Sequence, residues 1–498
     1  MGTRMEAEVA VVGGGTAGAV VAARLAAAGC DVVVIEAGPD YGPLAAGGWP
    51  ADLLDARALP TSHDWGYRTE GAAGQPLALE RARVLGGCST HNGCTQNWGW
   101  RGDYDAWGRH SPGWSADELA PAFARARTAM RLRHFAPDEI QPFQAAFVEA
   151  CAAAGHRLAD DLDDLDGGPG AGYAPVNIVD GVRWNTAVAY LDEVRERPGL
   201  RILGRTEVER VEPATDGLTR IHAREAAGPV VVSAAETVLC GGAYGTPELL
   251  LRSGIGDARE LERAGGTAAH DLPGVGRGLQ EHAAVQLEFD GSAELAARLG
   301  EFARHRWLPE EQAILKLASP PCEGPYDLHV FPWIEPDAAA PHGWKCVFPV
   351  ALLTPRSRGA VLPGGASGRA RIEHRYLGDP SDVGPIAHGL GALLPILAHP
   401  PLAALLGAPR SVPPAGDPDG LETHIRRHHA HYWHPGASCP MGPDPAAGAV
   451  VDEAARLHGL PAIRIADASI FPSLPRATTA MPSTVVGERV AELMGAAG

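Results

Sequence analysis

This chain of 498 residues has few cysteines, no secretory signal pattern and few long apolar runs. The 8 cysteines are scattered and form no Cys-x2-Cys pairs, so we expect reduced thiols in a cytoplasmic protein rather than a disulfide framework. Glu6 and Glu8 interrupt the start of the chain, which lacks a secretory signal pattern. Residues 386–406 are the most apolar late segment, but histidines and prolines within them predict a packed helix pair and no membrane span.

Basic residues are in the minority, with 42 Lys and Arg against 60 Asp and Glu and a net charge of −18. This balance argues against nucleic acid and anionic membranes as partners, and it is compatible with a cationic small molecule. The length exceeds one ordinary hydrophobic core, so we expect two intertwined lobes in a monomer or a homodimer. The 62 glycines and 43 prolines are spread along the chain, which indicates many tight turns rather than disorder.

The N-terminus has the pattern of a dinucleotide-binding unit. Residues 8–12 predict a strand, 13–18 a glycine-rich turn, 19–28 a helix and 31–35 a second strand, which ends at Glu36. Strand, glycine turn, helix, strand and acid in this order are typical of proteins that bind FAD or NAD.

Each position in this unit has a physical role. Gly13 permits the tight turn, Gly15 lets the backbone approach a pyrophosphate, and Gly18 lets the helix pack closely on the strand. Thr16 and Ala17 open the helix whose N-terminus faces the phosphates. Glu36 is placed to accept hydrogen bonds from the ribose hydroxyls, which favours FAD or NAD over NADP.

Residues 81–94 form a second glycine-rich stretch, and two interpretations of it are open. Cys88, His91 and Cys94 have a three-residue spacing that could serve a metal, although they supply only three ligands and no second cluster accompanies them. The alternative is a loop whose glycine backbone lies against a flavin. We favour the flavin and expect no metal.

Several further segments share one recognisable pattern. They are residues 83–93 with 103–107, 241–256 with 271–276 and 281–282, 434–442, and 464–472 followed by Pro482 and residues 488–489. In this order they resemble the glucose-methanol-choline (GMC) oxidoreductase family of flavoenzymes across essentially the whole chain. The His-Asn pair at His91 and Asn92 resembles the choline-oxidase side of that family.

The resemblance implies an α/β fold with two discontinuous domains. A Rossmann-like FAD-binding domain would comprise residues 1–110, 183–285 and 440–498. An α+β substrate-binding domain with an antiparallel sheet would comprise residues 111–182 and 286–439. The implied activity is FAD-dependent oxidation of an alcohol CH–OH group, with O2 or another acceptor taking the electrons.

The family pattern also implies a set of FAD contacts beyond the N-terminal turn. These are Arg83, Gly87, Asn92, Gly93, Val208, Asp467, Ala468 and Thr479. Asp467 has a simpler alternative role as a helix N-cap. For His91 the resemblance implies a covalent bond to the flavin 8α-methyl group, and the alternative is a histidine packed beside the dimethylbenzene ring.

His434 is the general base that the resemblance implies, because it precedes Pro435 and Gly436 in the family pattern. The family's second active-site residue is Asn or His, and Thr478 stands in its place. Threonine cannot act as a base near neutral pH. Three interpretations follow: Thr478 could orient the substrate while His434 works alone, a neighbour such as His431 or His282 could replace the missing group, or the activity could be altered. We favour the first, and place His431 behind the site or at the surface.

The substrate remains open among choline-like alcohols, sugars and amino sugars. Trp307, Trp333, Trp344 and Trp433, with the acids Glu323 and Glu335, could line a pocket for a cation, although we expect at least two of these tryptophans to be core residues. One rival is a family member without net redox turnover, such as a hydroxynitrile lyase or a photodecarboxylase. An NAD-dependent dehydrogenase would explain only the first 36 residues.

Overall fold

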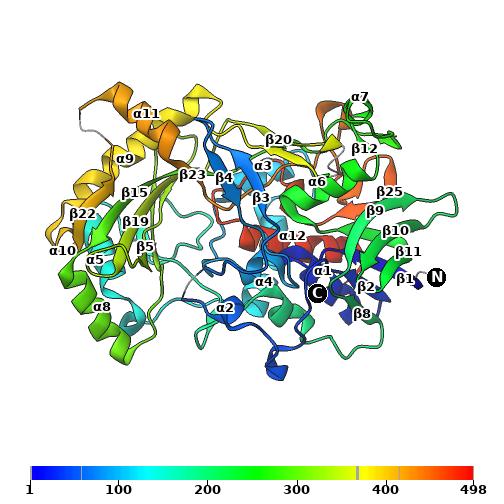
Figure 1. Ribbon diagram of the computed structural model, residues 1–498, viewed down its shortest axis with the longest axis horizontal. Coiled ribbons are helices and arrows are strands. Elements are labelled where there is room, and N and C mark those ends of the chain that lie inside the picture. The colour runs from blue at the N-terminus through cyan, green and yellow to red at the C-terminus, as the bar shows by residue number, and fades with distance from the viewer. Residues whose placement is uncertain (1–2, 58, 366–368, 414–415, 497–498) are drawn as a thin grey trace.

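The computed structural model describes residues 3–57, 59–365, 369–413 and 416–496. Figure 1 shows two lobes, one built around β1 (Thr3–Val12) and β11 (Gly228–Leu239), the other around β15 (Ala283–Gly291) and β19 (Trp344–Leu352). Both ends of the chain lie in the first lobe. This arrangement confirms the predicted fold class, in which an α/β lobe of separated segments joins a lobe with an antiparallel sheet.

The first lobe contains a mainly parallel sheet in the order β24-β25-β11-β1-β2-β8. Its other members on this path are β2 (Val32–Ile35), β8 (Leu200–Leu203), β24 (Arg456–Leu457) and β25 (Leu460–Ile465), and β9 (Glu207–Pro213) and β10 (Thr219–Glu225) extend from β11. All four residues of β2 are buried apolar residues, as a parallel strand covered on both faces requires.

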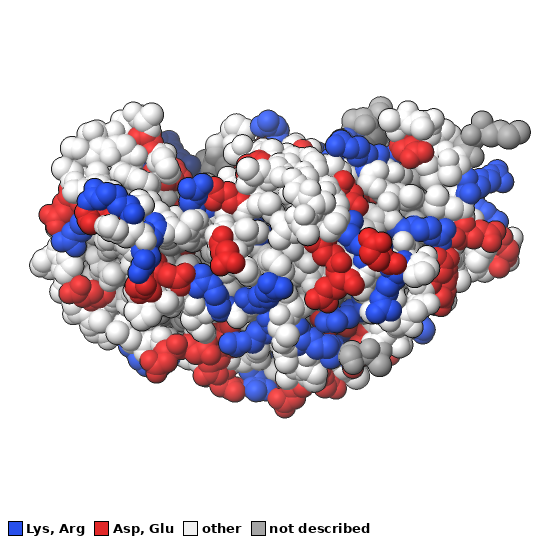
Figure 2. Space-filling view, turned by 90° about the horizontal axis from the view of Figure 1, so that it is seen from below, with Lys and Arg blue, Asp and Glu red and all other residues white. Residues whose placement is uncertain are grey.

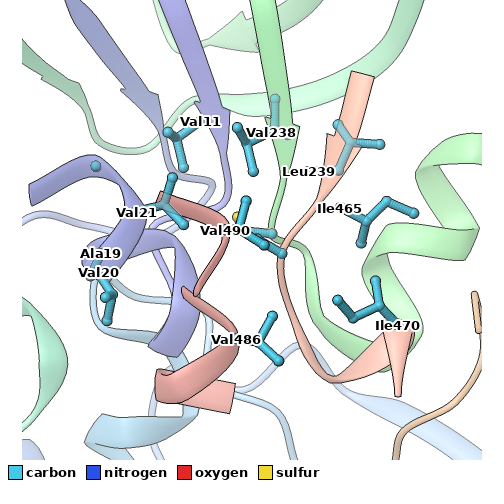
Figure 3. Packing of buried hydrophobic residues seen from close by; sticks show 14 of the residues in the cluster. Val11, Ala19, Val20, Val21, Val238, Leu239, Ile465, Ile470, Val486 and Val490 are labelled. Carbon is cyan, nitrogen blue, oxygen red and sulfur yellow. The ribbon is translucent and has the colours of Figure 1, made fainter. Parts of the chain in front are cut away.

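The core of this lobe joins segments that are far apart in the sequence (Figure 3). Val11 of β1, Val20 of α1 (Thr16–Ala27), Val238 of β11, Ile465 of β25 and Val486 of α12 (Ala480–Leu493) belong to one buried apolar cluster. Burial of such side chains supplies the main favourable free energy of folding.

One carboxylate fastens the helices of this lobe. Glu488 of α12 is buried and accepts hydrogen bonds from Arg24 at 2.7 Å, from the Tyr190 hydroxyl at 2.9 Å and from Arg125 at 3.0 Å. These partners lie on α1, on the π-helical turn η4 (Ala187–Leu191) and on α4 (Ala116–Ala129). Two arginines and one tyrosine hydroxyl therefore stabilise the buried negative charge.

The second lobe contains an antiparallel sheet in the order β22-β15-β19-β17-β16-β5. Besides β15 and β19 these strands are β5 (Gly170–Tyr173), β16 (Ala313–Leu317), β17 (Leu328–Val330) and β22 (Leu406–Ser411), and β18 (Trp333–Pro336) and β23 (His429–His431) pair at its margins. In Figure 1, α5 (Pro142–Ala153), α8 (Ala293–His305), α9 (Val383–Leu397), α10 (Pro400–Ala403) and α11 (Pro418–His428) lie around this sheet.

The remaining elements are short connections. They are η1 (Leu44–Ala46), α2 (Ala51–Leu54), β3 (Tyr67–Glu70), β4 (Pro76–Leu79), η2 (Gly87–Thr90), α3 (Arg101–Gly108), η3 (Pro137–Glu139), β6 (Ile178–Val179), β7 (Val182–Arg183), α6 (Gly242–Arg252), β12 (Ile255–Gly256), α7 (Ala258–Arg263), β13 (His270–Asp271), β14 (Arg277–Leu279), β20 (Gly359–Leu362), β21 (Arg371–Glu373), η6 (Pro380–Asp382), η7 (Pro445–Ala447) and η8 (Ala468–Ile470).

Two local predictions need adjustment or comment, and one strand ends early. The first strand begins at Thr3, earlier than expected, because its first half pairs with β11. The apolar stretch at 386–406 falls largely in α9 and α10, and no helix in the described part of the chain is long and apolar enough to cross a membrane. The strand β21 ends at Glu373, because Arg375 and Leu377 adopt left-handed φ angles of 52° and 53°.

The excess of acidic residues does not form one continuous patch on the face in Figure 2. Asp and Glu alternate there with Lys and Arg across the surface. Many of these side chains form exposed ion pairs, such as Arg101 with Asp166 at 2.7 Å and Arg133 with Glu139 at 2.7 Å. Such pairs contribute little to stability, so we assign them no functional role.

Candidate active site

A cavity of about 490 Å³ is lined by residues of both lobes. Of the expected site residues, those that line it are Gly13, Gly15, Thr16, Ala17, Glu36, Gly87, His91, Asn92, Gly93, Val208, His434, Asp467, Ala468, Thr478 and Thr479. Two expected cofactor residues, Gly18 and Arg83, are not part of its lining. Gly18 lies inside α1, where a side chain would collide with the carbonyl of Gly13.

The turn after β1 is shaped for close approach of a ligand to the backbone. Gly13 has a φ of +94°, and a Cβ atom there would lie 2.6 Å from the carbonyl oxygen of Cys240 at the end of β11. Only glycine satisfies both the left-handed angle and this contact. The turn delivers the N-terminus of α1 to the cavity, where its free amides suit a pyrophosphate.

The carboxylate of Glu36 is held rigidly at the end of β2. It accepts hydrogen bonds from the amides of Gly14 at 2.9 Å and Gly38 at 2.7 Å. Burial raises its pKa, and these two amides oppose that shift. Each carboxylate oxygen has a second acceptor position, so Glu36 can still receive a ribose hydroxyl.

The second glycine loop packs directly on the first. Gly87 has a φ of +53°, and a Cβ atom there would lie 2.6 Å from the Cα atom of Gly15. Arg83 precedes this loop and is outside the lining, and its side chain contacts two residues that line the cavity, Glu207 at 2.7 Å and the ring of Trp65 at 4.9 Å. Its side chain therefore supports β9 in this structure.

Asp467 lines the cavity, yet its carboxylate binds protein atoms. It accepts hydrogen bonds from the amide of Ser469 at 2.8 Å, the amide of Gly242 at 2.9 Å and the hydroxyl of Thr246 at 2.6 Å. The first bond caps η8, so the N-cap role is present, and the other two fix the N-terminus of α6. Asp467 thus holds η8 and the N-terminus of α6 in place at the cavity wall.

The loop that carries His91 separates its two cysteines. Cys94 is buried in a small apolar cluster with Phe135 and Val176, whereas Cys88 and His91 line the cavity. No group of three or more His, Cys, Asp or Glu side chains in the described residues is arranged to hold a metal. The Nε2 atom of His91 is buried and has no partner among the described residues.

Burial and the charge of Arg183 lower the pKa of His91 to about 4, so its imidazole is neutral at pH 7. Arg183 also fixes the loop, since its Nε donates to the carbonyl of Asn92 at 2.8 Å. A neutral, unpartnered nitrogen in the cavity wall is a group that a bound flavin can approach.

His434 is presented by a strained and firmly held turn. Trp433 before it has a left-handed φ of 60°, which costs free energy for a non-glycine residue. The amide of His434 donates to Glu281 at 2.8 Å, Gly436 and Gln280 exchange two backbone hydrogen bonds of 3.0 Å, and Arg81 donates to the carbonyl of Trp433 at 3.1 Å. Burial raises the pKa of Glu281 to about 8, against the opposing charge of Arg81.

A second histidine stands behind the first. The Nδ1 atoms of His434 and His282 are 3.0 Å apart, so one of them carries the hydrogen. If His434 donates, its Nε2 is left free to accept a proton. Burial and the neighbouring groups His282, His329 and Arg81 hold the pKa of His434 well below its usual value. Burial lowers the pKa of His282 to about 3, while the carbonyls of Leu353 and Pro475 oppose that shift.

Thr478 reaches the cavity, but the protein already uses its hydroxyl. The hydroxyl donates to the carbonyl of Thr95 at 3.2 Å and accepts from the amide of Asn97 at 3.4 Å. It can offer a substrate one remaining acceptor position. His431 is outside the lining and contacts Glu80 at 3.4 Å, so His282 is the histidine that pairs with His434.

The substrate side of the cavity differs in part from expectation. Trp333 and Trp433 line it together with Phe331 and Tyr432. Trp307 and Trp344 are outside the lining and are half-buried against apolar clusters, so they are not the fully buried core residues that were expected. The expected acids Glu323 and Glu335 are absent from the lining, and Glu310 and Glu311 are present instead. Glu335 of β18 pairs with Lys345 of β19 at 2.6 Å and accepts a hydrogen bond from the indole of Trp333 at 3.2 Å, so its carboxylate already has partners.

Glu310 and Glu311 had no motif to mark them, because they precede β16 as an ordinary Glu-Glu pair. Glu311 lies against Gly93 of the flavin loop and accepts from the Thr95 hydroxyl at 3.2 Å. Burial and the charge of Glu335 raise the pKa of Glu310 to about 8, and burial and the charge of Glu310 raise that of Glu311 well above its usual value. Two carboxyl groups therefore face the cavity beside four aromatic rings.

Comparison with known proteins identifies this arrangement. Residues 7–284 match the N-terminal profile and residues 355–487 the C-terminal profile of GMC oxidoreductases. The chain belongs to the GMC oxidoreductase family. It is therefore an FAD-dependent oxidoreductase, and the family acts on alcohols.

Individual GMC proteins resemble it over nearly their whole length. An oxygen-dependent choline dehydrogenase of Brucella canis is 30% identical, with 98% of this chain and 95% of that protein aligned. Pyridoxine 4-oxidase from Mesorbium loti is 27% identical, with a TM-score of 0.87 over 99% of this chain and 100% of that one. Formate oxidase of Aspergillus oryzae shares the fold, with 20% identity and a TM-score of 0.86 over 100% and 99% of the two chains.

The cavity fits FAD in this GMC chain by its own chemistry. The glycine turn and the N-terminus of α1 suit the pyrophosphate, Glu36 suits a ribose, and the glycine loop at Gly87 suits the flat ring system. The choline-oxidase-like resemblance is confirmed by the choline dehydrogenases among the similar proteins.

Proposed function

We propose that this chain oxidises the CH–OH group of a polar alcohol, with His434 as the base that removes the hydroxyl proton. The observation that carries the proposal is the His434–His282 pair, in which the first imidazole lines the cavity and the second stands behind it at 3.0 Å. Bound FAD supplies the hydride-accepting chemistry at its N5 atom. Thr478 positions the substrate rather than exchanging protons, because a neutral hydroxyl is a poor base.

Positively charged alcohols suit the substrate side of the cavity best. Glu310 and Glu311 offer carboxyl groups whose pKa burial raises and whose ionised form a bound cation would favour. Trp333 and Trp433 offer aromatic faces at which a cation is favoured. Two of the similar proteins are named for choline and pyridoxine, which are alcohols that contain nitrogen. Amino sugars share this chemistry, and neutral sugars would use only the hydrogen bonds.

The first prediction tests the reaction by anaerobic mixing with alcohols. We expect choline, or glucosamine in its protonated form, to bleach the flavin absorbance, and glucose or benzyl alcohol to do so more slowly, because only the first two bring a positive charge to the aromatic faces of Trp333 and Trp433. Dithionite serves as the control that the flavin can be reduced. A flavin that dithionite bleaches but no alcohol does would favour a member without net redox turnover.

We also propose that His91 is bonded to the 8α carbon of the flavin. The support is the unpartnered, buried Nε2 atom in the cavity wall and a pKa lowered to about 4, which keeps the imidazole unprotonated.

The eight cysteines are unpaired in the structure, which supports the further proposal of a reducing, cytoplasmic location.

The second prediction concerns this tether. After acid precipitation or a denaturing gel, the flavin of the native protein should remain with the polypeptide, and His91→Ala should release all of it. Cys88→Ala is the matched control, because Cys88 lines the same stretch of the cavity. The tether is excluded if acid frees the flavin of the native chain, or if Cys88→Ala rather than His91→Ala does so.

A further inference from the structure

A line of buried polar side chains crosses the second lobe behind the cavity. It begins at His282, continues to His329 on β17 and Lys316 on β16, and ends at Asp163. His329, Lys316 and Asp163 are 0%, 2% and 4% exposed. Polar groups at this depth normally have partners, so the side chains of His329 and Asp163, which have none among the described residues, call for an explanation.

The sheet register places Lys316 and His329 on one face. Lys316 is paired with His329, His329 with Ala351 and Ala351 with Ala284 across neighbouring antiparallel strands. Cross-strand partners share a face, and His282 lies two residues before Ala284, immediately ahead of β15. Ala284 and Ala351 are small, so little side-chain volume separates the ring of His282 from that of His329.

The groups on this line are close enough to influence one another. Lys316 lies over the ring of Tyr326 at 4.7 Å, and the ring of His329 stacks on the same tyrosine at 5.9 Å. Besides burial, the charges of Lys316 and His282 lower the pKa of His329. Lys316 and His329 thus share the ring of Tyr326, and the charge of His282 acts on His329 from the side of the active-site pair.

Several atoms along it lack protein partners. Both ring nitrogens of His329 and both carboxylate oxygens of Asp163 are buried without a hydrogen bond to any described residue. The Nζ atom of Lys316 donates to the carbonyl of Leu162 at 3.0 Å. Buried groups of this kind are usually joined by ordered water, which makes two to four hydrogen bonds.

The outer end reaches the surface. The amide of Asp163 donates to Asp161 at 2.7 Å, and Asp161 is exposed beside His134, with 4.0 Å between their side chains. Asp160, Asp164 and Asp166 are exposed in the same loop. These carboxylates can exchange protons with bulk water.

We propose that His282, His329, Lys316 and Asp163 form a water-linked conduit that carries the substrate's hydroxyl proton from His434 to the acidic surface loop 160–166. The inference rests on the proposed function, because it requires His434 to receive that proton. The balance is simple: the alcohol loses a hydride to the flavin and a proton to His434, and the proton then passes along the line to water.

The chemistry of the members suits this role. Burial and the nearby charge of Arg81 disfavour a positive charge on His434, so the proton that His434 takes from the substrate must move on. Burial lowers the pKa of Lys316 to about 8, and burial with the charge of Asp161 raises that of Asp163 to about 8, so both can exchange protons near neutral pH. Lys316 and Lys345 are the only lysines among the 42 basic residues, and an arginine at 316 could not release a proton.

The third prediction tests the conduit in a stopped-flow experiment on the holoenzyme without oxygen. The panel alcohol that bleaches the flavin fastest is mixed with enzyme and a pH-indicator dye, so that flavin reduction and proton release are recorded together. In the native enzyme the two signals should coincide. In His329→Leu and Asp163→Asn, bleaching should stay within about threefold, whereas proton release should lag by about tenfold or more.

Asp164→Asn is the matched control, because Asp164 is exposed one residue away from Asp163. Coincident signals in both His329→Leu and Asp163→Asn would overturn the conduit and leave the role of His434 intact. Unchanged bleaching in His434→Ala would instead overturn the proposed function. Should a variant fail to fold, a high-resolution crystal structure of the native enzyme decides: water is expected on His329 and Asp163, and a dry contact there contradicts the conduit.

Discussion

His434→Ala is expected to slow flavin reduction by about 10²–10⁴-fold, the usual contribution of a general base. The substitution removes the imidazole that lines the cavity and leaves the Nδ1 atom of His282 without its partner at 3.0 Å. The measurement is the rate of flavin bleaching at saturating alcohol under anaerobic conditions. Flavin content must be determined for the same sample, so that lost chemistry is separated from lost cofactor.

Thr478→Ala is the matched control for this fourth prediction. It lies in the same cavity, but its hydroxyl is held by Thr95 and Asn97, so we expect less than about a tenfold loss from its removal. The pH profile adds a second readout. The base acts unprotonated, and its pKa lies well below 6.5, so kcat/KM should fall only when the pH drops well below 6.5. Equal and small losses from both variants would reject His434 as the base.

Gly13→Ala, the fifth prediction, should yield protein with at least about tenfold less bound flavin, since the new methyl group would enter the backbone at Cys240. The clash spreads the ends of β1 and β11, which together hold the pyrophosphate turn. Flavin-to-protein absorbance ratio and thermal unfolding measure the effect.

Gly29→Ala separates this clash from backbone strain. Gly29 has the same φ of +94°, but a Cβ atom there meets nothing within 4 Å. Gly29→Ala should therefore lose only the roughly 1–2 kcal/mol of stability that a left-handed conformation costs, and it should retain its flavin. Equal flavin loss in both variants would show that strain alone, and not close packing at Cys240, explains the glycine.

The cofactor half of the site could be predicted from the sequence because its parts are local. Gly13, Gly87 and Glu36 work through turn geometry and strand ends, which leave a direct pattern in neighbouring residues. Arg83 shows the limit of this approach, since its motif position gave no sign that its side chain turns to Glu207.

The substrate half depends on contacts between distant segments. Glu310 and Glu311 reach the cavity only because β16 lies in a sheet whose order is unrelated to its sequence order. The same holds for His282, which meets His434 across 152 positions of the chain. Tertiary packing alone decided between these acids and Glu323 or Glu335.

The shared carboxylate of Glu488 has a consequence for how the protein is made. Its partners are on α1, α4 and η4, and β25 must insert beside β11, so the cofactor lobe needs segments from both ends of the chain. The ribosome releases the final helix last, and non-local pairing is slow. The cofactor lobe is therefore complete only once β25 and α12 have been synthesised, and until then the N-terminal segments expose the apolar surface that these two elements cover.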